Sequence, residues 1–270
     1  EMTSSLVGSE MCIRDRLLGF GCSVPGVLAA RTLPTRRDRA LTIVLTPCMS
    51  CSAKAPVYAA FAAAFFPGRS AVVFLALYAL GILAATGAAR LLGRTVLRGE
   101  AASFVLELPD YRWPDTRSVL RRMWVRTKEF LTRAFTVILA ASVGVWVLRT
   151  FTPTWRVATN AGESLLAVTG QALAPVFAPL GFGDWRASTA LLTGFTAKES
   201  VVSTLTLLLG GDTSQITTLF TPFTAAVFLV FVLLYTPCVA AIATVKRELG
   251  SARAAAATVL IQCAIAWVMA

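Results

Sequence analysis

Apolar runs of membrane-crossing length dominate this sequence and restrict what it can fold into. Of its 270 residues, 56% are hydrophobic and 14% are charged, and the mean hydropathy is +0.71, too apolar for an ordinary soluble domain. A bilayer span needs about 20 apolar residues. The pattern therefore predicts an all-α fold, a polytopic bundle of transmembrane helices. The expected spans include residues 70–92, 134–151, 188–210, 220–244 and 254–270.

Prolines, cysteines and charges interrupt these apolar runs at four places. Irregular backbone is tolerated at membrane depth only where protein buries it or where it lines a watery cavity. Paired interruptions of this kind indicate the substrate site of a transporter built from broken helices. The residues predicted to break the helices or line the transport path are Cys22, Pro25, Pro47, Cys48, Cys51, Pro56, Lys198, Glu199, Pro237 and Cys238.

Thiols among these interruptions favour a metal ion as the transported substrate. The chain has no histidine, which removes the commonest metal ligand. Ferrous iron accepts thiolate as well as carboxylate ligands. The candidate metal ligands are therefore Cys22, Cys48, Cys51, Cys238 and Glu199, together with exposed backbone carbonyls. We expect Cys22, Cys51 and Cys238 to approach one another near the middle of the membrane.

The cysteines also have a plainer interpretation. A buried cysteine is most often a small hydrophobe. Cys48 and Cys51 have the spacing of a redox or zinc pair, but the second pair and the histidines of a structural zinc site are missing. Cys263 lies in an uninterrupted apolar run, where we expect it to pack against lipid or core.

Lys198 and Glu199 lie inside an apolar run, where a charge costs roughly 3 kcal/mol on insertion scales and should face a cavity or a partner. In the functional interpretation, Glu199 attracts the cation or a coupled proton, and Lys198 anchors a broken helix end. In the alternative, both residues cap half-helices and hold two halves of the protein together.

Basic residues beside the expected spans account for the net charge of +11. Such clusters are typical of cytoplasmic loops, and nucleic-acid binding is not expected because it needs a soluble basic face. Residues 31–39 and 90–133 are therefore placed on the cytoplasmic side, with 104–114 at the interface and 116–133 as an amphipathic helix. Lys246, Arg247 and Arg253 also resemble a cytoplasmic cluster. Simple alternation of spans puts them outside, unless residues 164–182 cross the membrane or one broken segment is re-entrant.

Five segments together resemble one family of transporters. They are GFGCSVPGVLAART from residue 19, TPCMSCSAKAPVYAAFAAAFFP from 46, LELPDYRWP from 106, LLTGFTAKESVVSTL from 191 and FLVFVLLYTPCVAAIATVKRELGS from 228. From about residue 17 to its end, the chain resembles the membrane portion of the ferrous iron transporter B (FeoB) family. It departs from the family pattern at Gly26, where alanine is common, and at Cys48, where many members have an apolar residue.

The resemblance implies inward transport of Fe²⁺ across a bacterial plasma membrane by a multi-pass protein with two gate-type repeats. It also implies an N-terminal GTPase domain, which we expect to be missing here. None of the lysines, at 54, 128, 198 and 246, follows a glycine, so the chain lacks a phosphate-binding Gly-Lys-Ser/Thr loop. We therefore expect no enzymatic activity and no bound cofactor in this fragment, with GTP and Mg²⁺ acting only through the missing domain. The lipid bilayer and small cytoplasmic accessory proteins of iron uptake are expected partners, and a homo-oligomer is one option for its assembly.

The predicted units follow from these motifs. Residues 6–16 (LVGSEMCIRDR) are similar to a translated sequencing adapter, so residues 1–16 are treated as a scar outside the fold. Residues 17–92 form a first gate repeat truncated at its start, 93–133 a basic cytoplasmic or interfacial segment, and 134–270 a second gate repeat with the C-terminal helices. A faint internal repeat agrees with this: Gly-Phe at 19–20 precedes Thr-Pro-Cys at 46–48, and Gly-Phe at 194–195 precedes Thr-Pro-Cys at 236–238.

Three functions are compatible with these features. The first is a ferrous iron permease. The second is a gate-type transporter of an organic solute such as a nucleoside, which predicts several hydrogen-bonding side chains at the breaks. The third is a membrane thiol–disulfide enzyme that uses Cys48 and Cys51, in which replacing either cysteine would abolish turnover.

Overall fold

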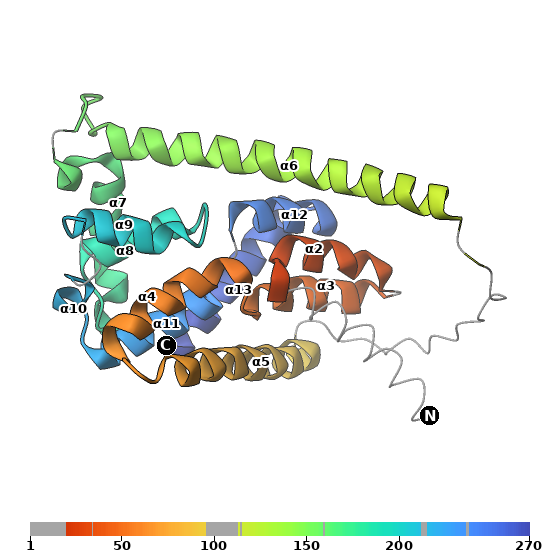
Figure 1. Cartoon of the computed structure of the whole chain (residues 1–270), viewed down its shortest axis with the longest axis horizontal. Coiled ribbons are helices and arrows are strands. Elements are labelled where there is room, and N and C mark those ends of the chain that lie inside the picture. Colours follow the sequence, from red (N-terminus) through yellow and green to blue (C-terminus); the bar gives the residue numbers. More distant parts are fainter. Residues whose placement is uncertain are drawn as a thin grey trace.

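The chain folds into a bundle of helices. The computed structural model describes residues 20–33, 35–95, 113, 115–158, 160–211, 215–235 and 238–270, and in these ranges the helices are joined by turns, with one isolated bridge between Phe151 and Val157. Figure 1 shows α5 and α6 running in opposite directions along the two long sides of the molecule. The expected all-α fold is confirmed. The helices are α2 (Ser23–Ala29), η1 (Ala30–Thr32), α3 (Arg36–Leu45), η2 (Thr46–Cys48), η3 (Ser52–Lys54), α4 (Ala55–Phe65), α5 (Ser70–Thr95), α6 (Thr116–Thr150), η4 (Ala161–Glu163), α7 (Leu165–Phe177), η5 (Ala178–Leu180), α8 (Trp185–Gly194), α9 (Ser200–Leu208), α10 (Ile216–Leu219), α11 (Pro222–Leu234), α12 (Val239–Leu249) and α13 (Ala252–Met269).

Within the described residues, four stretches are long and apolar enough to cross a membrane: Arg36–Phe65, Ser70–Gly93, Pro222–Leu249 and Ala252–Met269. The expected spans at 70–92, 220–244 and 254–270 are therefore confirmed. The stretch Arg36–Phe65 is a broken span that contains α3 and α4. The expected stretch 188–210 is broken at the predicted interruption, because α8 ends at Gly194 and α9 begins at Ser200. The expected span at 134–151 is a shorter apolar stretch, Phe135–Thr150, at the end of α6.

The first span is interrupted in its middle. α3 begins after Thr35, whose hydroxyl accepts a hydrogen bond from the Asp38 amide at 3.0 Å, and ends at Leu45. After η2 the backbone is extended at Met49 and Cys51 before η3 and α4 resume the helical path. Pro47 and Pro56 lie in the first turns of η2 and α4, where a missing N–H leaves no intrahelical hydrogen bond unmade. The prolines therefore start helical segments here.

α7 and α8 form a sharply bent pair. The helical stretch Leu165–Leu180 and α8 meet at 104°, with Gly181 at φ +83° in the turn between them. Gly170 of α7 lies directly against the Thr189 side chain and the Trp185 carbonyl of α8, so a side chain at 170 has no room. A bend of this size is that of a broken span or of a re-entrant loop.

α6 is the longest helix and leaves much of its apolar surface exposed. Asp115 caps it, because its carboxylate accepts hydrogen bonds from the Ser118 hydroxyl at 2.6 Å and from the Arg117 and Ser118 amides. These bonds, that from the Ser118 hydroxyl foremost, hold the pKa of the Asp115 carboxyl below its usual value. The exposed side chains along α6 include Leu120, Met123, Trp124, Phe135, Leu139 and Trp146.

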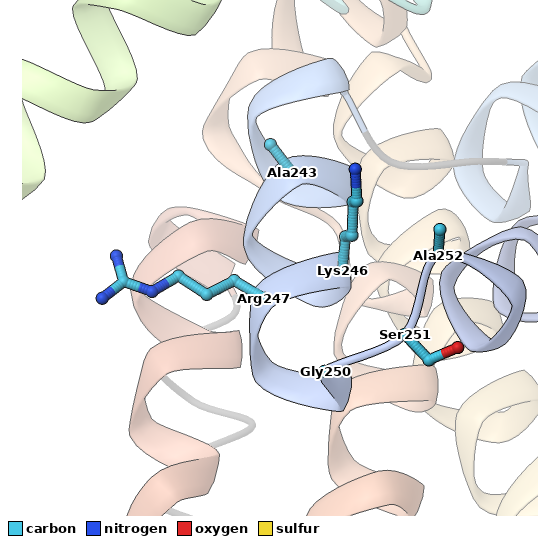
Figure 2. Close-up of a pocket in the computed structure, with 6 residues that line it drawn as sticks. All are labelled: Ala243, Lys246, Arg247, Gly250, Ser251 and Ala252. Carbon is cyan, nitrogen blue, oxygen red and sulfur yellow. The ribbon is translucent and has the colours of Figure 1, made fainter.

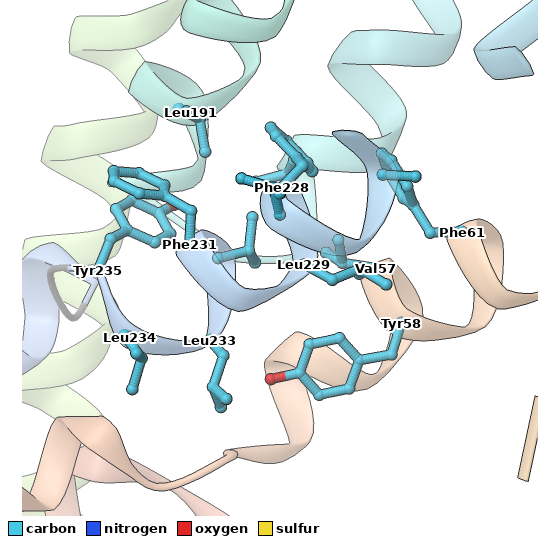
Figure 3. Packing of buried hydrophobic residues seen from close by; sticks show 14 of the residues in the cluster. Val57, Tyr58, Phe61, Leu191, Phe228, Leu229, Phe231, Leu233, Leu234 and Tyr235 are labelled. Carbon is cyan, nitrogen blue, oxygen red and sulfur yellow. The ribbon is translucent and has the colours of Figure 1, made fainter. Parts of the chain in front are cut away.

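The hydrophobic core is built around α11. Figure 3 shows its aromatic side chains packed with residues of α4 and α8. The Phe61 and Phe228 rings stack at a centroid distance of 5.1 Å, and Phe182 meets Phe228 edge-on at 5.3 Å. Because α11 is surrounded on several faces, its C-terminal end lies deep inside the protein.

A bidentate ion pair places the end of α12 beside η1. The Arg31 guanidinium donates two hydrogen bonds to the Glu248 carboxylate, one of them at 2.7 Å. The basic turn that starts at Arg31 and the basic end of α12 therefore lie on the same side of the membrane. This is the arrangement that alternation requires if the shorter apolar stretch Phe135–Thr150 also crosses the membrane and the α7–α8 pair does not.

Candidate functional site

Lys54 lies at the centre of the interrupted region. Its side chain is 2% exposed, and its ammonium donates hydrogen bonds to the carbonyls of Pro47 at 3.1 Å, Met49 at 2.9 Å and Leu233 at 2.6 Å. The first two carbonyls belong to the break after α3, and the third lies near the end of α11. Lys54 therefore joins two broken helix ends, and Leu233 lies 179 residues after it in the sequence.

These carbonyls need outside donors because a helix leaves its last four carbonyls without intrahelical partners. Pro237, four residues after Leu233, has no N–H to donate. A buried carbonyl without a donor is costly, and Lys54 supplies one. At the same break, Gln262 of α13 donates from Nε2 to the Val44 carbonyl at 2.8 Å.

Lys198 is held at the same end of α11. Its side chain is 3% exposed, and its ammonium donates to the Tyr235 carbonyl at 3.3 Å. The ammonium also lies 3.2 Å from the centroid of the Tyr235 ring, a cation–π contact. The Tyr235 hydroxyl is buried without a hydrogen-bond partner in the described structure, and it packs closely against Gly194. The Lys198 ammonium thus contacts both the carbonyl and the ring of the residue that follows α11.

Hydrogen bonds link all four interruptions into one region. The Ser52 hydroxyl donates to the Gly21 carbonyl at 2.8 Å, which joins the Cys51 segment to the segment of Cys22. The Val239 amide donates to the Phe195 carbonyl at 2.9 Å, which joins the Cys238 segment to the turn before Lys198. With the two lysines, these bonds connect breaks that are widely spaced in the sequence.

The predicted thiol ligands lie at the starts of helices around this region. Cys22, Cys51 and Cys238 immediately precede α2, η3 and α12, and Cys48 is the last residue of η2. Cys48 and Cys51 are buried, and Cys22 and Cys238 are half-buried.

Cys22 and Cys238 pack against one small cluster formed by Val24, Ala240 and Ala241. The helices that follow them, α2 and α12, pack against each other. In the described residues, however, no three His, Cys, Asp or Glu side chains are grouped closely enough to hold a metal ion. The three thiols thus share one region without forming a closed metal site.

Glu199 and the prolines occupy different surroundings. Glu199 precedes α9 and is exposed, and its side chain makes no capping hydrogen bond. Pro25 is half-buried within the first turn of α2, Pro47 is buried in η2, and Pro56 is exposed in α4. Pro237 lies outside the described residues.

A shallow surface pocket lies apart from these breaks, at the turn between α12 and α13. Figure 2 shows it lined by Lys246 and Arg247 on one side and by Ser251 and Ala252 on the other. It contains none of the predicted ligands, so it does not belong to the thiol-bearing region.

Comparison with known proteins identifies the family. The profile Gate, described as "Nucleoside recognition", matches residues 131–252, and a profile described as "Ferrous iron transport protein B C terminus" matches residues 74–126. The Fe(2+) transporter FeoB of Staphylococcus aureus (strain MSSA476) is 37% identical over 257 residues, which are 94% of this chain. The chain belongs to the membrane portion of the FeoB family. The expected resemblance is therefore confirmed, and the spans make the chain a multi-pass membrane protein.

Other FeoB relatives give similar values. The Fe(2+) transporter FeoB of Methanocaldococcus jannaschii is 39% identical over 245 residues, covering 87% of this chain and 36% of that protein. A Porphyromonas gingivalis protein named Fe(2+) transport protein A/Fe(2+) transporter FeoB fusion protein is 34% identical over 305 residues, covering 94% of this chain and 36% of that protein. The chain spans 39% of the S. aureus protein. Neither matching profile describes a GTPase domain. No solved structure matches the chain.

The sequence did not single out three residues that lie at these helix breaks: Lys54, Tyr235 and Gln262. A signal for Lys54 was present, because it follows Cys51 between two apolar runs, and a membrane-buried charge is a candidate functional residue by itself. Tyr235 and Gln262 carry no comparable signal. Their positions, just after α11 and within α13, become informative only when the helices pack.

Proposed function

We propose that this chain forms the membrane path of a ferrous iron transporter. The observation that carries the proposal is identity of 37% and 39% to proteins named Fe(2+) transporter FeoB, over 94% and 87% of this chain. The transported substrate is Fe²⁺, moved inward, and the two gate-type repeats predicted at 17–92 and 134–270 frame its path.

The arrangement of the breaks supports this proposal. Thiolates suit a borderline cation such as Fe²⁺, and backbone carbonyls at broken helix ends are a recurring cation site in transporters. Cys22, Cys51 and Cys238 are the proposed thiol ligands, with Cys48 and Glu199 as further donors. A loose set of ligands fits an ion that must be released as well as bound, which a tight resident metal site would prevent.

Partners are part of the same proposal. The chain spans 36% to 39% of these relatives, and we infer that a GTPase domain, which alone would bind GTP and Mg²⁺, completes the working protein. A small accessory protein also acts with the transporter, because the P. gingivalis relative carries a Fe(2+) transport protein A in the same chain. The site of action is the plasma membrane.

The test is anaerobic uptake of ferrous iron by vesicles that hold the protein. Uptake should exceed that of protein-free vesicles and should fall at least about tenfold in Cys51→Ser and Cys238→Ser, because losing a thiol ligand removes affinity in the path. Cys263→Ser is the matched control, since Cys263 is a half-buried thiol in the uninterrupted helix α13. Equal uptake by all three variants would show that these thiols do not take part in transport.

One observation favours a second candidate, transport of a nucleoside, because the Gate profile is described as "Nucleoside recognition". The same vesicles distinguish the two functions. Uptake of labelled uridine without ferrous iron uptake would support the second candidate and overturn the first.

A further inference from the structure

A path for cations does not explain why the ammonium groups of Lys54 and Lys198 are buried beside it. Lys54 and Lys198 are 2% and 3% exposed, and both donate to carbonyls at the end of α11, those of Leu233 and Tyr235. Within the described part of the chain, the hydrogen bonds that both ammonium groups make go to backbone carbonyls, and the ion pair found there joins Arg31 to Glu248 instead. Glu199, the carboxylate nearest in sequence, is exposed.

The partners of Lys54 are those that a metal or alkali cation would take. Three carbonyl oxygens surround its Nζ at 2.6 to 3.1 Å, and they come from two broken helix ends. A helix C-terminus carries about half a negative elementary charge, which attracts cations. Unwound carbonyls and half-helix C-termini coordinate coupling ions in transporters. The Lys54 ammonium therefore fills a cation site with a charge that is tethered to the chain.

The position of this tethered charge is also informative. Lys54 follows Cys51 by three residues, and Lys198 donates to the Tyr235 carbonyl, three residues before Cys238. A divalent cation that reaches these thiols would lie beside two fixed positive charges. It would be repelled unless the ammonium groups moved away, which would release the carbonyls of Pro47, Met49 and Leu233 as ligands.

We propose that Lys54 is a positioning residue that latches the path closed, and that a permeating divalent cation competes with its ammonium for the three carbonyls. Lys198, held by the Tyr235 carbonyl and ring, is the second point of attachment at the end of α11. The latch joins the α3–α4 break to α11, so its release separates the two halves of the chain at the thiols. This inference rests on the proposed ferrous iron path.

The first experiment compares Lys54→Met with Lys54→Arg in vesicles without metal. Methionine keeps most of the side-chain length and removes all three donors, whereas arginine keeps the charge. In Lys54→Met, maleimide modification of Cys51, located by mass spectrometry, should rise about tenfold, and Lys54→Arg should restore most of the protection. Lys246→Met is the matched control, because Lys246 is an exposed lysine of α12. Equal modification of Cys51 in wild type and Lys54→Met would overturn the latch.

A second measurement needs no variant, so it tests the proposed competition even if Lys54→Met does not fold. Wild-type protein is treated with a membrane-permeant amine-reactive ester, with and without anaerobic Fe²⁺. Competition predicts that Fe²⁺ raises the modification of Lys54 several-fold while Lys246 is unchanged. No effect of Fe²⁺ on Lys54 would overturn the competition.

The two proposals fail in different ways. If Fe²⁺ enters the vesicles and neither labelling experiment responds, the latch is wrong and the iron path stands. If Lys54→Met exposes Cys51 but wild type takes up no iron, the latch stands and the iron path is wrong.

Discussion

Tyr235 shows how one residue can serve two purposes at a helix break. Its ring covers the Lys198 ammonium at 3.2 Å and stacks on Phe231 at 5.5 Å, while its backbone carbonyl accepts a hydrogen bond from Lys198. Its hydroxyl has no partner in the described structure and packs against Gly194. A buried hydroxyl without a partner costs about 1–3 kcal/mol. The ring stabilises this break, and the hydroxyl does not.

Tyr235→Phe should therefore keep or raise the stability of the protein. It removes the unpartnered hydroxyl and leaves the ring in place, so we expect the free energy of unfolding to rise by about 1 kcal/mol or to stay unchanged. Tyr235→Leu, which also removes the cation–π contact, should lower it by roughly 1–2 kcal/mol relative to the phenylalanine variant. Thermal unfolding in detergent measures both. A large loss of stability in Tyr235→Phe would show that the hydroxyl has a bound partner.

At the scale of elements, close packing sets the shape of the α7–α8 pair. A Cβ added at Gly170 would overlap the Thr189 hydroxyl and would lie 3.0 Å from the Trp185 carbonyl and 3.2 Å from the Thr189 amide. Small residues let membrane helices approach one another closely. The two helices can therefore pack at a bend of 104° only if position 170 lacks a side chain.

Gly170→Ala should separate α7 from α8 and destabilise the protein. Overpacking of this kind costs about 1–3 kcal/mol, because backbone atoms of α8 cannot move out of the way cheaply. Gly144→Ala is the control, since Gly144 lies in α6 with nothing near its added Cβ, and alanine there should be neutral or stabilising. The readout is the midpoint of thermal unfolding, and equal midpoints for the two variants would contradict the close packing.

At the scale of the whole molecule, the Arg31–Glu248 pair and the bent α7–α8 pair define one consistent topology. If Phe135–Thr150 of α6 crosses the membrane and α7 and α8 return to the side from which they enter, the spans alternate so that η1 and the end of α12 share a side. The ion pair shows that they do share it. The turn between α4 and α5 and the connection after α6 then lie on the opposite side.

This topology predicts which positions an impermeant maleimide reaches. Arg36→Cys and Arg247→Cys should be labelled from one face of the membrane, and Arg69→Cys and Trp155→Cys from the other. All four native residues are exposed, so access to the reagent does not depend on unfolding. Sided labelling of right-side-out and inverted vesicles measures this. Labelling of Arg247→Cys with the Trp155→Cys group would mean that α7–α8 crosses the membrane.

The sequence by itself determined the class of the protein and the places where its helices break. Hydropathy identifies spans because backbone in hydrocarbon must satisfy its own hydrogen bonds, and the breaks at Pro47 and after Gly194 follow from the same requirement. The sequence also shows that Lys54 and Lys198 lie within apolar runs, although only Lys198 was predicted to be a functional residue. The thiol ligand set and the two gate repeats remain predictions.

Only the tertiary structure decided which groups meet at these breaks. Lys54 reaches the Leu233 carbonyl over 179 residues, and Gln262 reaches Val44 over 218, contacts for which local sequence carries no signal. The exposed position of Glu199 and the 104° bend between α7 and α8 were equally undetermined, because both depend on how helices pack. The physical reason is that hydropathy reports what a segment must bury, whereas a hydrogen-bond partner is set by the three-dimensional arrangement of the other segments.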